Sequence, residues 1–150
     1  MSHIKYSQST LERLPEIVSL NHSIFDGMYE NPPYNLEDYQ RKLHDVKPII
    51  YIAEKDGKII GDIISFAKGN EWYIWILGVS RDNRQQGVAN TLLELQEKYA
   101  KEHGHNKVTV KVYNISKEML RLVIKKNYEI EDVEKHDNTK HNAILLGLSI

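Results

Sequence analysis

The sequence predicts a single α/β domain, residues 1–150, built around a central mixed and mostly antiparallel sheet. Three apolar, β-branched runs follow one another in the middle of the chain, with tight-turn signals at 56–57 and 69–70 between them. An amphipathic helical stripe then separates two strand-like runs within 71–112, so these two strands should be parallel. The length of 150 residues is that of one ordinary domain.

The remaining elements follow from periodicity and from capping residues. Ser9, with Glu12 three residues later, resembles a capping box, but Pro15 suits a first helical turn and favours a later start for the first helix. A turn-rich loop at 26–34 precedes a second helix, which Asn35 can cap. We expect about four helices. The first carries the helically spaced Leu14, Ile17, Val18, Ile24 and Phe25, the second runs from Asn35 to about residue 45, the third runs about 17 residues from Gly87, and the fourth is capped by Ser116 and carries Met119, Leu122 and Val123. We expect strands near 4–6, 49–54, 58–67, 71–79, 107–112, 128–133 and 143–150.

Composition excludes several classes of function. The net charge of −1 gives no overall basic field for nucleic acid. We find no apolar stretch long enough for a membrane helix and no apolar signal core at the start, so we expect a cytoplasmic protein. The absence of cysteine excludes an acyl-cysteine intermediate, and the seven scattered histidines read as solvated turn residues, so no metal site is expected.

The segment with the most chemical information is 77–89, where an apolar strand ends and a long helix begins near Gly87. The first turn of a helix leaves backbone N–H groups unpaired and carries partial positive charge, which together attract anions. Gly87 and the small Ala89 leave room for a phosphate, and Arg84 can add a charged contact. An ordinary loop-to-helix junction with a helpful glycine explains the same residues.

Neither GxxxxGK[ST] nor GxGxxG occurs, but residues 84–89, Arg-Gln-Gln-Gly-Val-Ala, fit the pattern Gln/Arg-x-x-Gly-x-Gly/Ala. With this motif between a strand ending Leu-Gly-Val and a long helix, the chain resembles the GNAT superfamily of N-acetyltransferases over nearly its whole length. The resemblance implies acetyl-coenzyme A as cofactor, with the parallel strand pair splayed around it. It implies cofactor contacts at Leu77, Gly78, Val79, Arg84, Gln85, Gln86, Gly87, Val88, Ala89, Asn90 and Asn114, although Asn114 fits a plain turn equally well.

The catalytic groups are harder to assign. The family usually carries a proton-donating tyrosine where this chain has Val123, and valine donates no proton. Tyr113 is then a candidate donor, and the N–H of Val79 a candidate oxyanion contact. Glu71 is the candidate base, since Glu71, Tyr73 and Trp75 alternate onto one strand face, although a solvated strand-end glutamate is the simpler interpretation and the one that we favour.

The resemblance also implies a region that binds the amine acceptor, and aromatic residues lie in this region of the chain. Phe25, Tyr29 and Tyr34 lie between the first two helices, and Tyr73 lies on the central strand; they would either line an amine pocket or cover the core edge. The first functional hypothesis is direct acetyl transfer, in a ternary complex, to a small-molecule or peptide amine. The alternatives are a non-catalytic acyl-coenzyme A sensor and a ligand-free interaction domain. Exposed edge strands would also allow a homodimer.

Overall fold

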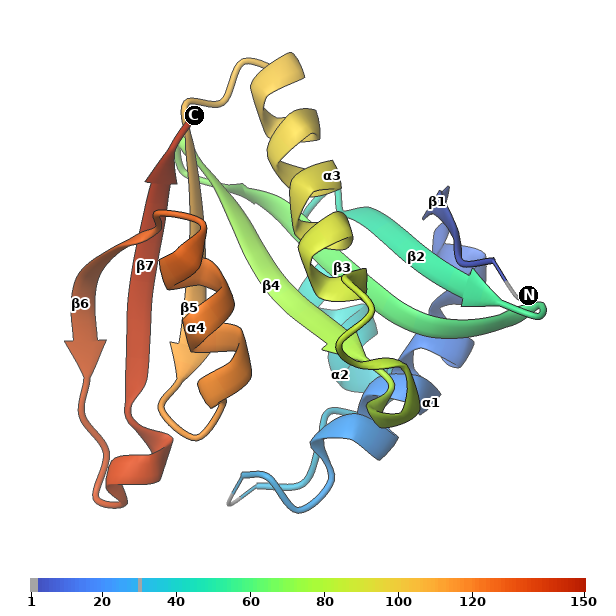
Figure 1. Ribbon diagram of the computed structural model, residues 1–150, viewed down its shortest axis with the longest axis horizontal. Helices are drawn as coiled ribbons and strands as arrows, with labels where there is room; N and C mark the ends of the chain where they lie inside the picture. Colours follow the sequence, from blue (N-terminus) through green and yellow to red (C-terminus); the bar gives the residue numbers. More distant parts are fainter. Residues whose placement is uncertain (1–2, 30) are drawn as a thin grey trace.

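The computed structural model describes residues 3–29 and 31–150 as a seven-stranded sheet with helices on both faces (Figure 1). The strand order is β1-β2-β3-β4-β5-β7-β6, and every neighbouring pair is antiparallel except β4 and β5. The strands are β1 (Lys5–Ser9), β2 (Ile49–Lys55), β3 (Lys58–Lys68), β4 (Glu71–Val79), β5 (Lys107–Tyr113), β6 (Glu129–Glu134) and β7 (Ala143–Ser149). The α-helices are α1 (Leu14–Phe25), α2 (Leu36–Leu43), α3 (Val88–Glu102) and α4 (Lys117–Lys125), and the 3-10 turns are η1 (Leu11–Arg13), η2 (Arg81–Asn83) and η3 (Thr139–His141).

This architecture confirms the predicted fold class and the parallel pair at the crossover. The starts of α1 and α2 show how capping residues and proline determine where a helix begins. Asn35 forms the expected cap of α2, because its side chain accepts from the N–H of Asp38 while Asp38 accepts from the N–H of Asn35. The capping pattern at Ser9 is not used: Ser9 ends β1, and α1 begins at Leu14 with Pro15 in its first turn, which confirms the later start that Pro15 favoured.

Two apolar cores hold the helices against the sheet. On one face, α3 and α4 pack through Val88, Leu92 and Val123 against β4 and β5. On the other face, α1 and α2 pack against β2 and β3. The indole N–H of Trp72 donates to Gln96 of α3 at 2.9 Å, so the polar atoms of this buried pair are satisfied. The strand β4 is therefore covered on both sides, as its continuous apolar run predicted.

The parallel pair separates halfway along its length. Pairing between β4 and β5 ends at Ile74 and Val110, although β4 continues to Val79 and β5 to Tyr113. Beyond that point each strand keeps its outer neighbour, β3 or β7. Figure 1 shows the two strands starting together and moving apart toward their carboxyl ends. The sheet is thus open along the inner edge of β4.

A β-bulge lies where the strands part. In the pairing of β3 with β4, Ile64 faces Ile76 and Ser65 faces Ile74, which leaves Trp75 as the additional residue. A bulge bends its strand and increases the local twist, so it directs the end of β4 away from β5. It also reverses the alternation of side chains, so that Gly78 faces α1 while Val79 faces the core beneath α3.

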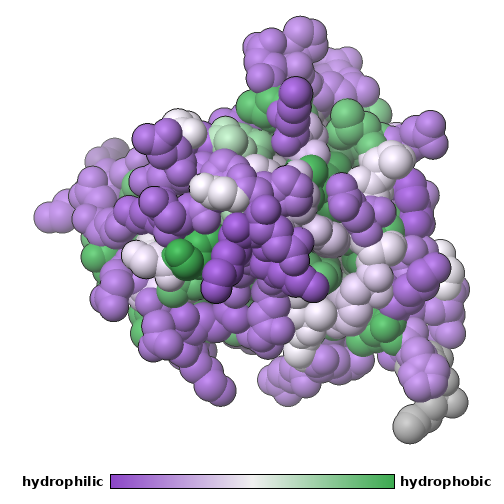
Figure 2. Space-filling view, turned by 90° about the horizontal axis from the view of Figure 1, so that it is seen from above, coloured by the Kyte–Doolittle hydropathy of each residue, from purple (hydrophilic) through white to green (hydrophobic). Residues whose placement is uncertain are grey.

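The face of the molecule drawn in Figure 2 is mostly polar. The face in Figure 2 is covered largely by hydrophilic residues, and its hydrophobic residues form small separate groups. None of the described helices combines the length and apolar character that crossing a lipid bilayer requires.

Candidate functional site

The loop from β4 to α3 forms an exposed cradle of backbone amides. Gln85 and Gly87 take left-handed conformations, with φ of 64° and 76°, and Gly87 is the N-cap of α3. No side chain caps this end of α3, and its first turn holds no acidic residue. A Cβ built on Gly87 would meet nothing within 4 Å, so the space beside these amides is open. The first-turn amides and the positive end of a 15-residue helix can together attract an anion.

Two polar side chains, those of Arg84 and Asn90, lie beside the cradle. The guanidinium of Arg84 donates through Nε to the carbonyl of Val79 at 3.4 Å, which holds it across the end of β4. The side chain of Asn90 lies along the surface of α3, because its side-chain amide donates to the carboxylate of Glu94 at 3.0 Å. The side-chain amide of Asn90 is therefore engaged within α3, and its backbone N–H lies in the first turn of the helix. The sequence-predicted residues Arg84, Gln85, Gln86, Gly87, Val88, Ala89 and Asn90 all belong to this one junction.

The open edge of β4 adjoins the cradle. Leu77, Gly78 and Val79 are the last residues of β4, beyond the point where pairing with β5 ends. Their other edge is paired with β3, with Leu77 opposite Ile63. An extended molecule lying between β4 and β5 would meet a free strand edge at one end and the amide cradle at the other. The structure therefore brings the predicted strand residues and the predicted loop residues into one continuous site.

A polar aromatic cluster lies at the end of β5, on the other side of the opening. The rings of Tyr29 and Tyr113 are 5.0 Å apart, and the hydroxyl of Tyr29 lies 3.2 Å from Oγ of Ser116. The ring of His141 meets Tyr29 edge-on at 6.3 Å. Burial raises the pKa of Tyr29, so this hydroxyl stays protonated at neutral pH. Groups that carry exchangeable protons thus meet from four separate segments: the hydroxyls of Tyr29, Tyr113 and Ser116, and the imidazole of His141.

His141 is the residue that sequence reasoning missed. It stands in η3, between β6 and β7, where it read as a solvated turn histidine. Its partner Tyr29 is more than a hundred residues away in the chain, and nothing local in the sequence signals that contact. The sequence supplied only the expectation of a turn at this point.

The candidate base Glu71 and the residue at the family's tyrosine position, Val123, both lie away from the opening. Glu71 begins β4 at the opposite end of the strand from Val79, and its carboxylate lies 3.6 Å from Nζ of Lys107. The structure does not bring Glu71 to the open edge. Val123 is fully buried in the core beneath α4.

Asn114 follows β5 directly and organises a turn. Its side-chain amide donates to the carbonyl of Thr139 at 3.2 Å, and its side-chain oxygen accepts from Nζ of Lys117 at 2.5 Å. Its backbone N–H donates to Asn142 at 2.7 Å. These bonds join the end of β5 to η3 and α4. Asn114 therefore has the role of a turn residue, one of the two roles expected for it.

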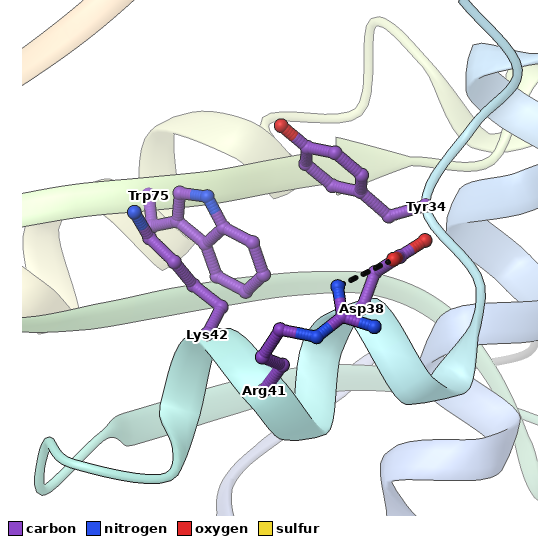
Figure 3. Close-up of a pocket in the computed structure, with 5 residues that line it drawn as sticks. All are labelled: Tyr34, Asp38, Arg41, Lys42 and Trp75. Carbon is purple, nitrogen blue, oxygen red and sulfur yellow. Dashed lines mark hydrogen bonds and ion pairs between the residues drawn. The ribbon is translucent and has the colours of Figure 1, made fainter.

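The predicted acceptor residues divide between two places. Phe25 packs near Tyr29, with ring centroids 6.3 Å apart, and belongs to the cluster at the end of β5. Tyr34 stacks on Trp75 at 6.0 Å and lines a pocket of about 370 Å³ between α2 and β4 (Figure 3). Tyr73 lies on β4 against Phe66, with centroids 5.7 Å apart, and burial raises its pKa.

The pocket beside Trp75 carries charge as well as aromatic surface. Figure 3 shows Asp38, Arg41 and Lys42 reaching from α2 around the Trp75 and Tyr34 rings. Arg41 donates to Asp38 at 3.2 Å. Among residues 3–29 and 31–150, no three His, Cys, Asp or Glu side chains come together as a metal-binding group.

Comparison with known proteins places this geometry in a family. The model of the acetyltransferase (GNAT) family matches residues 14–123. An acetyltransferase of Sodalis glossinidius is 30% identical over 95 residues, which are 63% of this chain and 67% of that protein. An acetyltransferase of Yersinia pestis matches to the same extent.

Solved structures share the fold over nearly the whole chain. The ribosomal-protein-S18-alanine N-acetyltransferase of Escherichia coli superimposes with a TM-score of 0.82 at 14% identity, covering 99% of this chain and 94% of that one. The PaiA N-acetyltransferase of Thermoplasma acidophilum, solved with coenzyme A, gives a TM-score of 0.78 at 16% identity and 99% coverage of both chains. The family match across both cores and the amide cradle settles the classification: this chain belongs to the acetyltransferase (GNAT) family.

Proposed function

We propose that the protein transfers an acetyl group from acetyl-coenzyme A to a primary amine, by direct transfer in a ternary complex. The observation that carries the proposal is the opening between β4 and β5 directly beside the amide cradle at Gly87. Family membership supports acetyl transfer, and structural neighbours were solved with coenzyme A or acetyl-coenzyme A.

The site fits coenzyme A in two parts. The amides from Gln85 to Asn90 would hold the pyrophosphate, because they face open space at the positive end of α3. The free edge of β4 from Leu77 to Val79 would pair with the amides of the pantetheine arm, as an added strand would. This arrangement directs the thioester into the opening, toward the end of β5.

Acetyl-coenzyme A supplies an activated acyl group as a thioester. The neutral amine attacks the acyl carbon, a C–N bond forms and the C–S bond breaks. We assign the N–H of Val79 to the developing oxyanion and the hydroxyl of Tyr113 to the departing thiolate. With no cysteine in the chain, the acyl group passes to the amine without a cysteine-bound intermediate.

The proton lost by the amine needs an acceptor near the opening. Glu71 lies at the other end of β4 and is bound to Lys107, so we no longer favour it. A water molecule at the cluster of Tyr29, Tyr113 and His141 is the simpler acceptor.

The acceptor would be a small-molecule or peptide amine that approaches from the side of α1 and α2. Aromatic surface from Tyr34 and Trp75 would hold its apolar part. Lys42 lies at the same pocket, beside the ion pair of Arg41 with Asp38, and would favour an acceptor that carries an anionic group away from its amine.

A non-catalytic acyl-coenzyme A sensor is the second candidate, and Val123 in place of the usual proton donor is the observation that favours it. The purified protein should be given acetyl-coenzyme A and a panel of amines while free thiol is recorded. Thiol release that depends on the amine supports the enzyme. Binding of acetyl-coenzyme A in calorimetry, without thiol release on any amine, supports the sensor instead.

Tyr113→Phe should lower kcat by about 10-fold or more, because removing a general acid costs at least that factor when the leaving group depends on it. The dissociation constant for coenzyme A should stay within about twofold, since only a hydroxyl is removed. Steady-state kinetics and calorimetry on the same preparation check both quantities. Tyr51→Phe is the control, because Tyr51 lies on β2, away from the opening. An unchanged kcat removes Tyr113 from the mechanism.

A further inference from the structure

A buried carboxyl group lies directly behind the open edge of β4. Asp62 is fully buried on β3, opposite Gly78 of β4. The side-chain amide of Asn21, also buried, reaches it from α1 and donates to Asp62 Oδ2 at 2.9 Å. The other two oxygens of the pair, Asp62 Oδ1 and Asn21 Oδ1, are buried and have no hydrogen-bond partner among the described residues.

The surroundings of Asp62 disfavour a negative charge. It faces Ile52 of β2 and Gly78 of β4, and Tyr39 of α2 is the titratable group turned toward it. Among the described residues, no cation contributes to the electrostatics of Asp62. Burial raises the pKa of Asp62 to about 7, and the hydrogen bond from Asn21 only partly opposes this. Burial also raises the pKa of Tyr39, so its hydroxyl stays neutral.

We infer that Asp62 is held as a neutral carboxylic acid in a two-bond pair with Asn21. In this pair Asp62 Oδ1–H donates to Asn21 Oδ1, while Asn21 Nδ2–H donates to Asp62 Oδ2. A planar carboxylic acid and a planar amide can make both bonds at once. One proton therefore satisfies both orphaned oxygens, whereas a carboxylate would leave two buried acceptors without a donor.

The pair acts as a positioning element for β4. A Cβ placed on Gly78 would overlap Asn21 Oδ1 and lie 3.4 Å from Asp62 Oδ1, so the pair packs directly against this backbone. Gly78 is one of the strand residues assigned above to the donor arm. Ionisation of Asp62 would remove the shared proton. The two acceptor oxygens, Asp62 Oδ1 and Asn21 Oδ1, would then repel each other behind β4. This consequence rests on the proposed function; the protonation state itself does not.

The first test is a carbon-detected NMR titration of the wild-type protein, following Cγ of Asp62. The neutral pair predicts that Asp62 remains protonated well above pH 5 and titrates near neutral pH. Titration near the ordinary aspartate value of about 4 overturns the inference.

The second test is Asp62→Asn, because the amide of asparagine can donate to Asn21 Oδ1 just as the acid does. The folded-state pKa of Asp62 lies above its unfolded value, so the wild type loses stability as pH rises from about 4 through about 7. Asp62→Asn should lack this loss and be at least as stable as the wild type at pH 8 in urea unfolding. Asp45→Asn, an exposed site, is the control. Lower stability of Asp62→Asn than of the wild type at pH 8 contradicts a neutral pair.

Coenzyme A binding supplies the functional readout. At pH 6, Asp62→Asn should bind within about threefold of the wild type, and at pH 8.5 the wild type should be weaker than the variant by about fivefold or more. Parallel pH dependence of the two proteins would remove the positioning role. If neither protein binds coenzyme A at any pH, the proposed function fails, while the NMR titration still decides the state of Asp62.

Discussion

Replacing Gly87 with glutamate is expected to weaken coenzyme A binding by about 100-fold or more. The substitution puts a negative charge into the open space beside the first-turn amides of α3, where the diphosphate is proposed to lie. Setting like charges together at a binding site costs several kcal/mol, and each 1.4 kcal/mol is about tenfold in affinity. Isothermal titration calorimetry with coenzyme A measures the change.

Two matched variants separate charge from backbone strain. The φ of 76° at Gly87 strains any side chain, so Gly87→Gln reproduces the size and strain of glutamate without its charge. Gly87→Asn tolerates the left-handed conformation better. Glutamine should lose much less affinity than glutamate, and asparagine less still. Equal losses for glutamate and glutamine would mean that no phosphate lies beside this residue.

Gly78→Ala is expected to lower the free energy of unfolding by about 2 kcal/mol, and the Tm by about 4–8 °C. The new Cβ would overlap Asn21 Oδ1 and come within 3.2 Å of Ile24 Cδ1, so the cost comes from contact with α1. Differential scanning calorimetry and urea unfolding give both quantities. Affinity for coenzyme A should fall as well, because β4 must shift toward the opening.

The double variant with Asn21→Ala tests the cause. Removing the Asn21 side chain removes the nearest obstacle, so Gly78→Ala should cost less in the Asn21→Ala background than in the wild type. Additive costs would show that Asn21 does not oppose the new methyl group.

Local patterns predicted most of the fold. Turn residues and apolar periodicity were sufficient for the antiparallel order β2-β3-β4, because Asp56-Gly57 and Gly69-Asn70 each join neighbours in the sheet. The cradle was also predictable, since a glycine between a strand end and a helix start is a local signal. The start of α1 was harder, because Ser9 and Glu12 satisfy a capping pattern that the proline at position 15 overrides.

The rest of the site depends on long-range geometry. The bulge at Trp75 reverses which β4 residues face α1. The sequence has no glycine or proline at this point that would predict a bulge. Strict alternation from Glu71 therefore misassigns the second half of the strand. Asn21 and Asp62 meet across 41 positions, and each by itself reads as an ordinary surface residue. Only packing of α1 on the sheet makes them a buried pair.

The most direct test of the account is an amide chemical-shift map of the ¹⁵N-labelled protein with coenzyme A and, separately, with pantetheine. Coenzyme A should shift the amides from Gln85 to Asn90 together with those of Leu77 to Val79, because phosphate cradle and strand edge form one site. Pantetheine, which lacks the diphosphate, should shift the strand residues and leave Gly87 unchanged. Shifts from coenzyme A that leave Gly87 and its neighbours unmoved would contradict the assignment of the donor site.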